Sequence, residues 1–397
     1  MQTNVRLLFA LMIALQVFRP LGAGTPDLDN WLEKIRAVGP DGAGGIEAGR
    51  ALRRLRDAEP AALPDLLVAF DGANPRAQNY LRGAVETIAD RALAGGRELP
   101  TAELQRFIED RRHDPRGRSL AFDLLRRADE AAAERLLASL LTDPSAELRR
   151  EAVQRELDRA TALRKRFESA GDDDQPRLRE PVIAAYLKAL TGAVDDDQVK
   201  AIVGPLRQLG RTIDLPEHFG LITDWRIIGP FDHRAGKGFE AVYPPEREVD
   251  FSAEYEGQLG RVRWQPISTG HEYGVVDIAG QLENYKGSCM YLAAEFHSPE
   301  RRRVQVRLGT PNSWKLWLNG RFLFGREEYH RGMELDQYQV DAELKAGRNV
   351  ILFKICQNEQ DEDWAQRYEF QLRVCDQAGA AVRSEPPAEV SRSEPRP

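Results

Sequence analysis

The sequence predicts a multi-domain chain in which a helical array is followed by an antiparallel β-sandwich. Apolar residues recur at helical spacing from about Asp27 to Leu209, whereas short apolar or alternating runs separated by turns follow from Asp224. The composition changes as well: three of the Trp and Tyr residues lie within residues 25–215, and the other thirteen lie after them. We therefore expect a domain boundary near 214–220.

Charge and cysteine content exclude several classes of protein. The 397-residue chain has 42% hydrophobic residues and a net charge of −7, which divides into +2 for residues 1–24, −3 for 25–215 and −6 for 216–397. Neither long segment is a basic surface, so we expect no nucleic-acid partner. Three cysteines are too few for a disulfide scaffold or a four-cysteine zinc site.

The N-terminus has the pattern of an export signal. Arg6 precedes an apolar stretch of 11 residues, Leu7–Val17, which suits a signal-peptide core and is shorter than the roughly 20 residues that span a bilayer. Small residues at Gly22–Gly24 predict cleavage near 23–24. Residues 1–24 are thus expected to be a signal peptide, and the mature protein to be periplasmic or extracellular without stable membrane insertion. The alternative is a buried N-terminal helix.

Residues 25–215 carry repeated helix-start signals. Asn74-Pro75, Asp114-Pro115 and Asp143-Pro144 each place a capping side chain before a proline at the first helical position. Spacings of 40 and 29 residues are typical of two-helix repeats. The segment Asp143–Val153 resembles the second helix of HEAT-type repeats, which implies an α-solenoid that docks a protein partner. An irregular bundle without repeats is the alternative.

Residues 216–378 are predicted to form the β-sandwich. Asn319-Gly320 between two apolar runs is a strong hairpin signal, and a turn at Ala346–Asn349 leads into another apolar strand. About eight to ten strands are expected in this region. Those that we assign are Trp225–Gly229, Arg261–Pro266, Cys289–Phe296, Val304–Leu308, Lys315–Leu318, Asn349–Cys356 and Tyr368–Val374.

Several of these segments resemble the galactose-binding-like jelly roll, an accessory module of secreted bacterial carbohydrate-active enzymes. They are Trp317–Gly320, Leu344–Val350 and Phe370–Val374. The opening Trp225–Asp232, followed by Gly238–Glu246, is similar to large uncharacterised exported proteins of planctomycete-type bacteria. The resemblance covers about 150 residues and implies the fold of this region. It does not identify a ligand, since such modules are often structural.

A carbohydrate site needs an exposed aromatic ring beside planar polar groups. Trp364 lies in the polar stretch Asn358–Arg367 and is the best candidate, with Asp361, Asp363 and Arg367 as hydrogen-bonding neighbours. The alternative is that the Trp364 ring folds back to cover the edge of the sandwich.

Catalytic and metal signals are weak. The six histidines are dispersed, and the chain has no nucleophile elbow, phosphate loop or dinucleotide fingerprint. The Asp172–Asp174 and Asp195–Asp197 runs do not have the ligand spacing of an EF-hand loop. We therefore expect no catalytic residues, metal or cofactor. One disulfide is possible, with Cys356 and Cys375 on adjacent segments as the preferred pair.

The expected function is that of an exported, non-enzymatic interaction or scaffold protein, whose sandwich binds carbohydrate or is structural. A polysaccharide lyase is the alternative, because some lyases join a helical toroid to a β-sandwich. That reading requires groups such as His113 and Tyr80 to converge in a deep cleft. The tail at 379–397 is rich in Pro, Ser, Glu and Arg and is predicted to be disordered.

Overall fold

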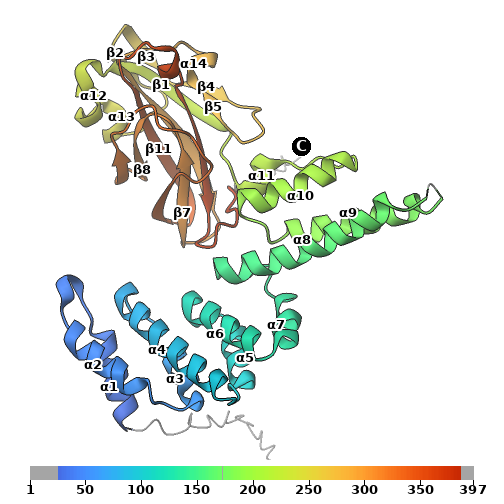
Figure 1. The fold of residues 1–397 in the computed structure, drawn as a ribbon. Helices are drawn as coiled ribbons and strands as arrows, with labels where there is room; N and C mark the ends of the chain where they lie inside the picture. Colours follow the sequence, from blue (N-terminus) through green and yellow to red (C-terminus); the bar gives the residue numbers. More distant parts are fainter. Residues whose placement is uncertain (1–25, 172, 386–397) are drawn as a thin grey trace, which may run out of the picture. The chain divides into compact units, whose positions relative to one another are not determined.

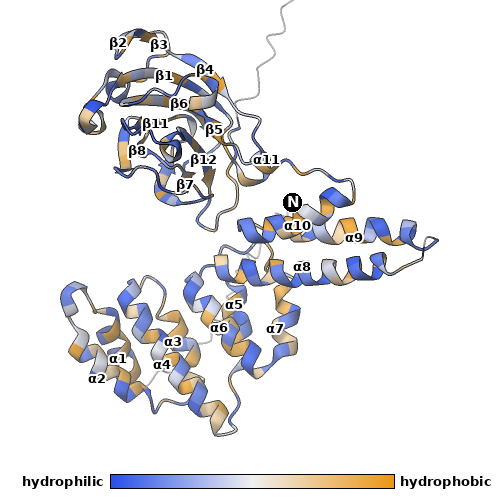
Figure 2. Ribbon diagram, turned by 45° about the horizontal axis from the view of Figure 1, so that its top comes forward, coloured by the Kyte–Doolittle hydropathy of each residue, from blue (hydrophilic) through white to orange (hydrophobic). Residues whose placement is uncertain are grey.

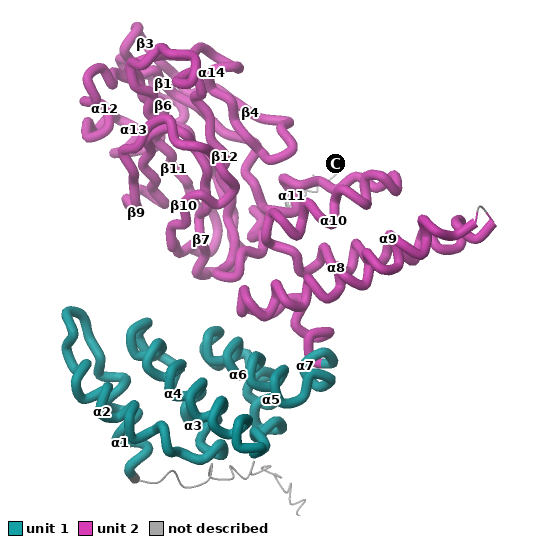
Figure 3. The backbone as a smooth tube through the Cα atoms, viewed as in Figure 1, with its two compact units in different colours: residues 1–135 teal, residues 136–397 magenta. Residues whose placement is uncertain are grey.

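The computed structural model describes residues 26–171 and 173–385, and it shows helices followed by antiparallel strands, as the sequence predicts (Figure 1). The segment assigned to the export signal lies outside the described residues. The chain divides into two compact units, of which unit 1 extends to Arg135 and unit 2 begins at Leu136 (Figure 3).

Unit 1 is built from short helices. They are α1 Pro26–Arg36, α2 Gly45–Leu55, α3 Leu63–Val68, α4 Pro75–Ala94, α5 Thr101–Glu109 and α6 Pro115–Ala128, and α7 Glu130–Leu137 crosses into unit 2. The α1 helix packs on α2, and α5 packs on α6. Their buried faces consist mainly of Leu, Ile and Ala side chains.

Two predicted caps of unit 1 are confirmed, and each also bonds an earlier segment of the chain. The Asn74 Oδ1 atom accepts hydrogen bonds from two backbone N–H groups of the first turn of α4 at 3.0 and 3.1 Å. Its Nδ2 atom donates to the Val38 carbonyl at 2.7 Å. Asp114 caps α6 and accepts a 2.9 Å bond from the buried Gln78 on α4. The caps therefore also connect α4 to the loop after α1, and α6 to α4.

The third predicted cap is wrong by two residues. The next helix, α8, begins at Ala146, and Ser145 rather than Asp143 is its cap, accepting from Leu148 N–H at 3.4 Å. Asp143 instead accepts a 2.9 Å bond from the Ser145 N–H and forms the turn before the cap. The proline of Asp143-Pro144 thus lies outside the helix.

The helices of unit 2 are α8 Ala146–Glu168, α9 Gln175–Leu190, α10 Asp196–Gln208 and α11 Leu215–Phe219. They share one apolar cluster, which includes Val153, Tyr186, Ile202 and Phe219. Among the described residues, no helix is both long and apolar enough to cross a membrane.

The strands form two larger antiparallel sheets and one hairpin. The six-stranded sheet has the order β4-β1-β6-β11-β8-β9, the four-stranded sheet has the order β10-β7-β12-β5, and β2 pairs with β3. Their bounds are β1 Asp224–Asp232, β2 Glu254–Gly257, β3 Gly260–Arg263, β4 Gln265–Ser268, β5 Val276–Asp277, β6 Ser288–Ser298, β7 Arg302–Gly309, β8 Ser313–Leu318, β9 Arg321–Arg326, β10 Tyr338–Leu344, β11 Gly347–Gln357 and β12 Glu369–Cys375. The short helices α12 Lys237–Glu240, α13 Pro244–Arg247 and α14 Ile278–Gln281 lie between them.

The Asn319-Gly320 hairpin is confirmed. It joins β8 to β9, and its two residues have φ values of 53° and 76°. Positive φ at both turn positions is what a tight right-twisted hairpin needs, and Asn and Gly adopt it at low cost.

Each face of the six-stranded sheet has its own apolar layer. One cluster combines residues of both larger sheets, among them Leu292, Trp314 and Phe370. Figure 2 colours the hydrophobic stretches of the strands orange. The other cluster joins the opposite face to the segment after β1, through residues such as Phe239 and Trp264. Central strands such as β6 and β11 are therefore buried on both faces, which explains their long apolar runs.

Helix α11 is bound to the strands through a buried arginine. Arg373 on β12 is 1% exposed and donates to both carboxylate oxygens of Asp336 at 2.6 and 2.5 Å. Its remaining nitrogen donates to the carbonyls of Phe219 and Gly379 at 3.1 and 2.9 Å. The guanidinium also lies over the Phe219 ring, 5.4 Å from its centroid. The end of the helical region thus shares its polar contacts with the sheet.

The change from helices to strands falls between Phe219 and Asp224, close to the expected position, whereas the compact units divide at Arg135/Leu136. Helices α8–α11 therefore cluster with the strands. At the other end, residues 379–385 are placed against the sheet, where Val382 N–H donates to the Val374 carbonyl at 2.9 Å and the Val382 side chain is buried. This corrects the expected start of the disordered tail, whose remainder, 386–397, lies outside the described residues.

Candidate functional site

Trp364 is the exposed aromatic residue that the sequence singles out. It lies on a single 3₁₀ turn, Asp363–Ala365, in the loop between β11 and β12, and it is 59% exposed. The other Trp residues on the strands are buried: Trp225 is 3%, Trp314 0% and Trp317 6% exposed. The Trp364 ring does not fold back into the core.

The loop that carries Trp364 is held by hydrogen bonds from the segment before β6. Lys286 Nζ donates to the Ala365 carbonyl at 2.8 Å, and Asn284 Nδ2 donates to the Gln366 carbonyl at 3.0 Å. From β11, the buried Gln357 donates to the same Ala365 carbonyl at 3.1 Å. These bonds fix the loop before any ligand arrives, which reduces the ordering cost of binding.

His330 completes the surface beside the indole. Its ring is perpendicular to that of Trp364, with centroids 5.0 Å apart, and its Nε2 atom is 2.9 Å from Asn358 Oδ1. A perpendicular contact covers at most one face of the indole, so His330 leaves the other face uncovered. The backbone of His330 has a φ of 56°, a conformation that non-glycine residues seldom adopt and that occurs disproportionately at functional sites.

The polar residues of the predicted site have different positions. Asp361 and Asp363 are exposed on the Trp364 loop, and Asp361 also accepts from Gln366 through its carbonyl at 2.9 Å. Arg367 is exposed too, but it forms an ion pair with Glu369 at the start of β12. Residues 358–362 line a surface hollow of about 650 Å³ next to this turn.

Sequence reasoning missed His330 and Asn358. Asn358 opens the polar stretch that was singled out, so its position was a usable signal. His330 is 34 residues earlier in the chain, and only the folding of the segment after β9 brings it to Trp364.

The expected Cys356–Cys375 disulfide is wrong. All three cysteines are buried free thiols. Cys356 is on β11 of the six-stranded sheet, whereas Cys375 is on β12 of the four-stranded sheet, where its Sγ donates to the Gln305 carbonyl at 3.7 Å. Strands that are consecutive in the sequence enter different sheets, so proximity along the chain does not predict this pairing.

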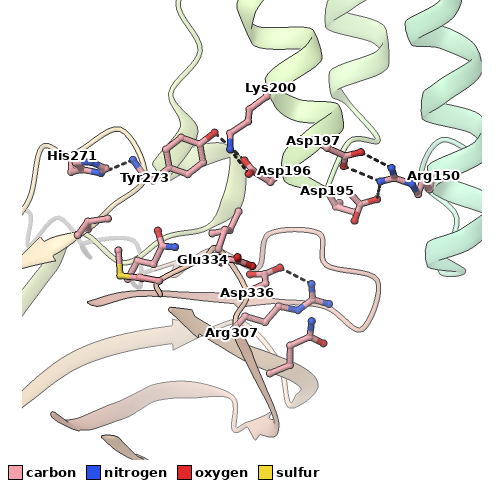
Figure 4. A pocket seen from close by; sticks show the side chains of 16 residues that line it. Arg150, Asp195, Asp196, Asp197, Lys200, His271, Tyr273, Arg307, Glu334 and Asp336 are labelled. Carbon is pink, nitrogen blue, oxygen red and sulfur yellow. Dashed lines mark hydrogen bonds and ion pairs between the residues drawn. The ribbon is translucent and has the colours of Figure 1, made fainter. Parts of the chain in front are cut away.

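A second candidate is a cleft of about 790 Å³ within unit 2, between the start of α10 and the strands (Figure 4). The three carboxylates at the start of α10 are engaged by basic side chains. Arg150 donates to Asp195 at 2.8 Å and to both oxygens of Asp197 at 3.0 and 2.5 Å, and Lys200 donates to Asp196 at 2.6 Å. The hydrogen bonds of Arg150 hold the pKa of Asp197 below its ordinary value.

The other side of the cleft repeats this pattern. The Tyr273 hydroxyl donates to Asp196 at 2.9 Å, and Arg307 donates to Asp336 at 2.8 Å. Burial and the bond to Asp196 raise the pKa of Tyr273, so the hydroxyl keeps its proton. These pairs join α10 to the loops and strands.

The remaining histidines of interest are also engaged. His233 is buried, with Nε2 2.7 Å from the Tyr329 hydroxyl, and burial followed by the charge of Lys354 lowers its pKa to about 4. In unit 1, His113 stacks on Phe107 at 4.1 Å between centroids, and its Nδ1 is 2.7 Å from Asp71. Within the described ranges, no group of three or more metal-ligating side chains converges.

Comparisons with known proteins do not identify a family for this chain. No family model matches the chain, and no curated protein matches it. Similar solved structures include a beta-glucuronidase from an uncultured Clostridium sp. (12% identity, 40% of this chain and 29% of that chain, TM-score 0.23) and a GH31 alpha-xylosidase from Xanthomonas citri (9%, 39% and 16%, 0.18). A beta-glucosidase from Kluyveromyces marxianus is another (10%, 74% and 35%, 0.26). The chain spans at most 35% of these proteins, and at such TM-scores the likeness carries no argument.

Proposed function

We propose that this is an exported, non-enzymatic interaction protein whose β region binds carbohydrate at Trp364 and whose helical region docks a protein partner. In this proposal, the helices form a HEAT-like solenoid, and the two sheets form a galactose-binding-like jelly roll. The observation that carries it is the exposed Trp364 ring on a loop fixed by three hydrogen bonds from neighbouring segments.

The chemistry of the loop supports a sugar ligand. An indole face offers a flat apolar surface to the C–H face of a pyranose ring, and amide and carboxylate groups at its edge take hydroxyl hydrogen bonds. Asn358 and Asp361 provide an amide and a carboxylate on the same loop, and the His330 imidazole lies beside the indole. Trp364 is the platform in this proposal, and the polar groups select the orientation of the sugar.

For the helical region, the support comes from its construction. The cap Asn74 of α4 bonds the loop after α1, and the cap Asp114 of α6 bonds Gln78 on α4, so each cap contacts a segment from an earlier part of the array, as expected of stacked repeats. Ile46 on α2 is 74% exposed and offers an apolar contact for a partner.

The lyase alternative has less support. It needs a proton-transfer group free to act in the helical part, and His113 is engaged by Asp71 and Phe107. Engaged carboxylates in the cleft of unit 2 likewise favour binding or structure over catalysis.

A glycan array probed with the wild type and Trp364→Ala tests the sugar proposal. We expect the wild type to bind a subset of glycans and Trp364→Ala to lose at least about tenfold in affinity, since an aromatic contact of this size contributes more than about 1.4 kcal/mol. Phe322→Ala is the matched control, because Phe322 on β9 is also exposed, at 51%, and lies outside the Trp364 loop. No binding by the wild type, or equal binding by wild type and Trp364→Ala, contradicts the proposal.

A further inference from the structure

Two of the three thiols face each other across neighbouring strands. Cys289 on β6 and Cys356 on β11 are direct partners in the antiparallel register, between the pairs Met290–Ile355 and Ser288–Gln357. Both are 0% exposed, and both belong to the apolar cluster on the outer face of the six-stranded sheet. Their side chains therefore leave the sheet on the same side.

This placement meets the distance requirement of a disulfide. Directly opposed residues of an antiparallel pair have Cα atoms about 4.5 or 5.5 Å apart, depending on the type of pair. Protein disulfides accept Cα separations of about 4.4–6.8 Å. We propose that Cys289 and Cys356 form a disulfide across β6 and β11 when the chain folds under oxidising conditions, and that Cys375 remains a free thiol.

Cys375 is excluded by its position. It lies at the end of β12, in the sheet that pairs with β7, and its thiol contacts the Gln305 carbonyl. Neither Cys289 nor Cys356 belongs to that sheet. A bond from Cys375 to either of them would require a strand to change sheets.

The bond must form before the strands close over the thiols. Burial, with a smaller contribution from Cys356, raises the pKa of the Cys289 thiol well above its ordinary value, so the folded protein presents little thiolate. Disulfide formation therefore depends on the folding state. The thiols of an unfolded or partly folded chain are reactive, whereas the folded reduced protein resists oxidation.

The chemistry is thiol–disulfide exchange with a small disulfide such as oxidised glutathione. One cysteine thiolate attacks the disulfide and releases one reduced glutathione, giving a mixed disulfide. The second thiolate attacks the protein sulfur of that mixed disulfide, forms the Cys289–Cys356 bond and releases a second reduced glutathione. The protein loses two protons and two electrons, and one oxidised glutathione becomes two reduced molecules.

The test is refolding of the full chain from denaturant in a mixture of oxidised and reduced glutathione. Free thiols are then alkylated in denaturant without reduction, and intact mass and peptide mapping locate the modified cysteines. We expect one alkyl group, on Cys375, and a cross-linked peptide joining Cys289 to Cys356. Alkylation of all three cysteines, or a dominant cross-link that contains Cys375, would overturn the proposal.

Serine variants give matched controls. Cys375→Ser is expected to keep the cross-link and take up no alkyl group, whereas Cys289→Ser and Cys356→Ser are each expected to take up two. A cross-link in either of the last two variants at the wild-type yield contradicts the assignment. If a variant fails to refold, the peptide map of the wild type decides alone.

Discussion

Two helical regions of the chain have similar compositions but different structural partners. The helices up to α6 form a compact unit by themselves, whereas α8–α11 cluster with the strands. Arg373 donates to the Phe219 carbonyl on α11, and the Tyr273 hydroxyl donates to Asp196 on α10. Polar side chains of the strand region therefore bind helices of the second set. A change in composition therefore marks where strands begin, and not where one compact unit ends.

Removing the buried guanidinium of Arg373 is expected to give the largest difference in stability between unit 1 and unit 2. Arg373→Ala leaves the carboxylate of Asp336 with Arg307 alone, and loss of one partner of a buried ion pair costs about 3–5 kcal/mol. We expect hydrogen exchange to show earlier unfolding of peptides from unit 2 and unchanged peptides from unit 1. Arg50→Ala, which removes an exposed pair with Glu47, is the control and should change stability by less than about 1 kcal/mol.

Removing the cap of α4 is expected to destabilise unit 1 and leave unit 2 unchanged. Asn74→Ala removes the cap and the bond to Val38, and a lost cap costs about 1–2 kcal/mol. The effect should be confined to unit 1 in urea unfolding followed by hydrogen exchange. Asp214→Ala, which removes the cap of α11, should act on unit 2 instead. Equal effects of both variants on both units would remove the distinction.

Acid should weaken unit 2 through His233. Burial, then the charge of Lys354, lowers the pKa of His233 to about 4, below the ordinary value of about 6.5 in the unfolded chain. The unfolded state therefore binds the proton first, and stability is lost as the pH falls from about 6.5 towards 4. Burial also lowers the pKa of His218, which adds to the same trend.

We expect His233→Gln to flatten the pH dependence of unit 2 between pH 7 and 5, measured as the urea midpoint of its peptides. Its amide is expected to retain a hydrogen bond to the Tyr329 hydroxyl. A wild-type slope that persists in His233→Gln would assign the effect to other groups.

The smallest stability effect is expected at Trp364. Its side chain is mostly exposed, so Trp364→Ala should change the free energy of unfolding of unit 2 by no more than about 0.5 kcal/mol. Thermal unfolding checks this. A larger loss would mean that the indole is a packing residue, as the alternative reading of the sequence has it.

Local signals in the sequence located much of the fold. Caps at Asn74 and Asp114 and the turn at Asn319-Gly320 depend on a few adjacent residues, and they were predicted correctly. The strand β10, Tyr338–Leu344, was missed, although its apolar residues alternate with polar ones as expected of a strand with one buried face.

Contacts between residues far apart in the sequence could not be predicted from these local signals. Nothing adjacent to Cys356 indicates that β12 enters the other sheet, and the disulfide prediction failed for that reason. His330 reaches Trp364 only through the fold. The polar neighbours of Trp364 made it a candidate but left open whether its ring folds back over the edge of the sandwich, and only the structure places it on the surface.

Whether α8–α11 share a folding unit with the strands is tested most directly by hydrogen exchange of the full chain across a urea series. We expect peptides of α8 and α10 to lose protection at the same urea concentration as those of β7 and β12, and peptides of α4 and α6 at a different one. If α8 and α10 instead unfold together with α4 and α6, while the strands remain protected, the division of the chain at Arg135/Leu136 is contradicted.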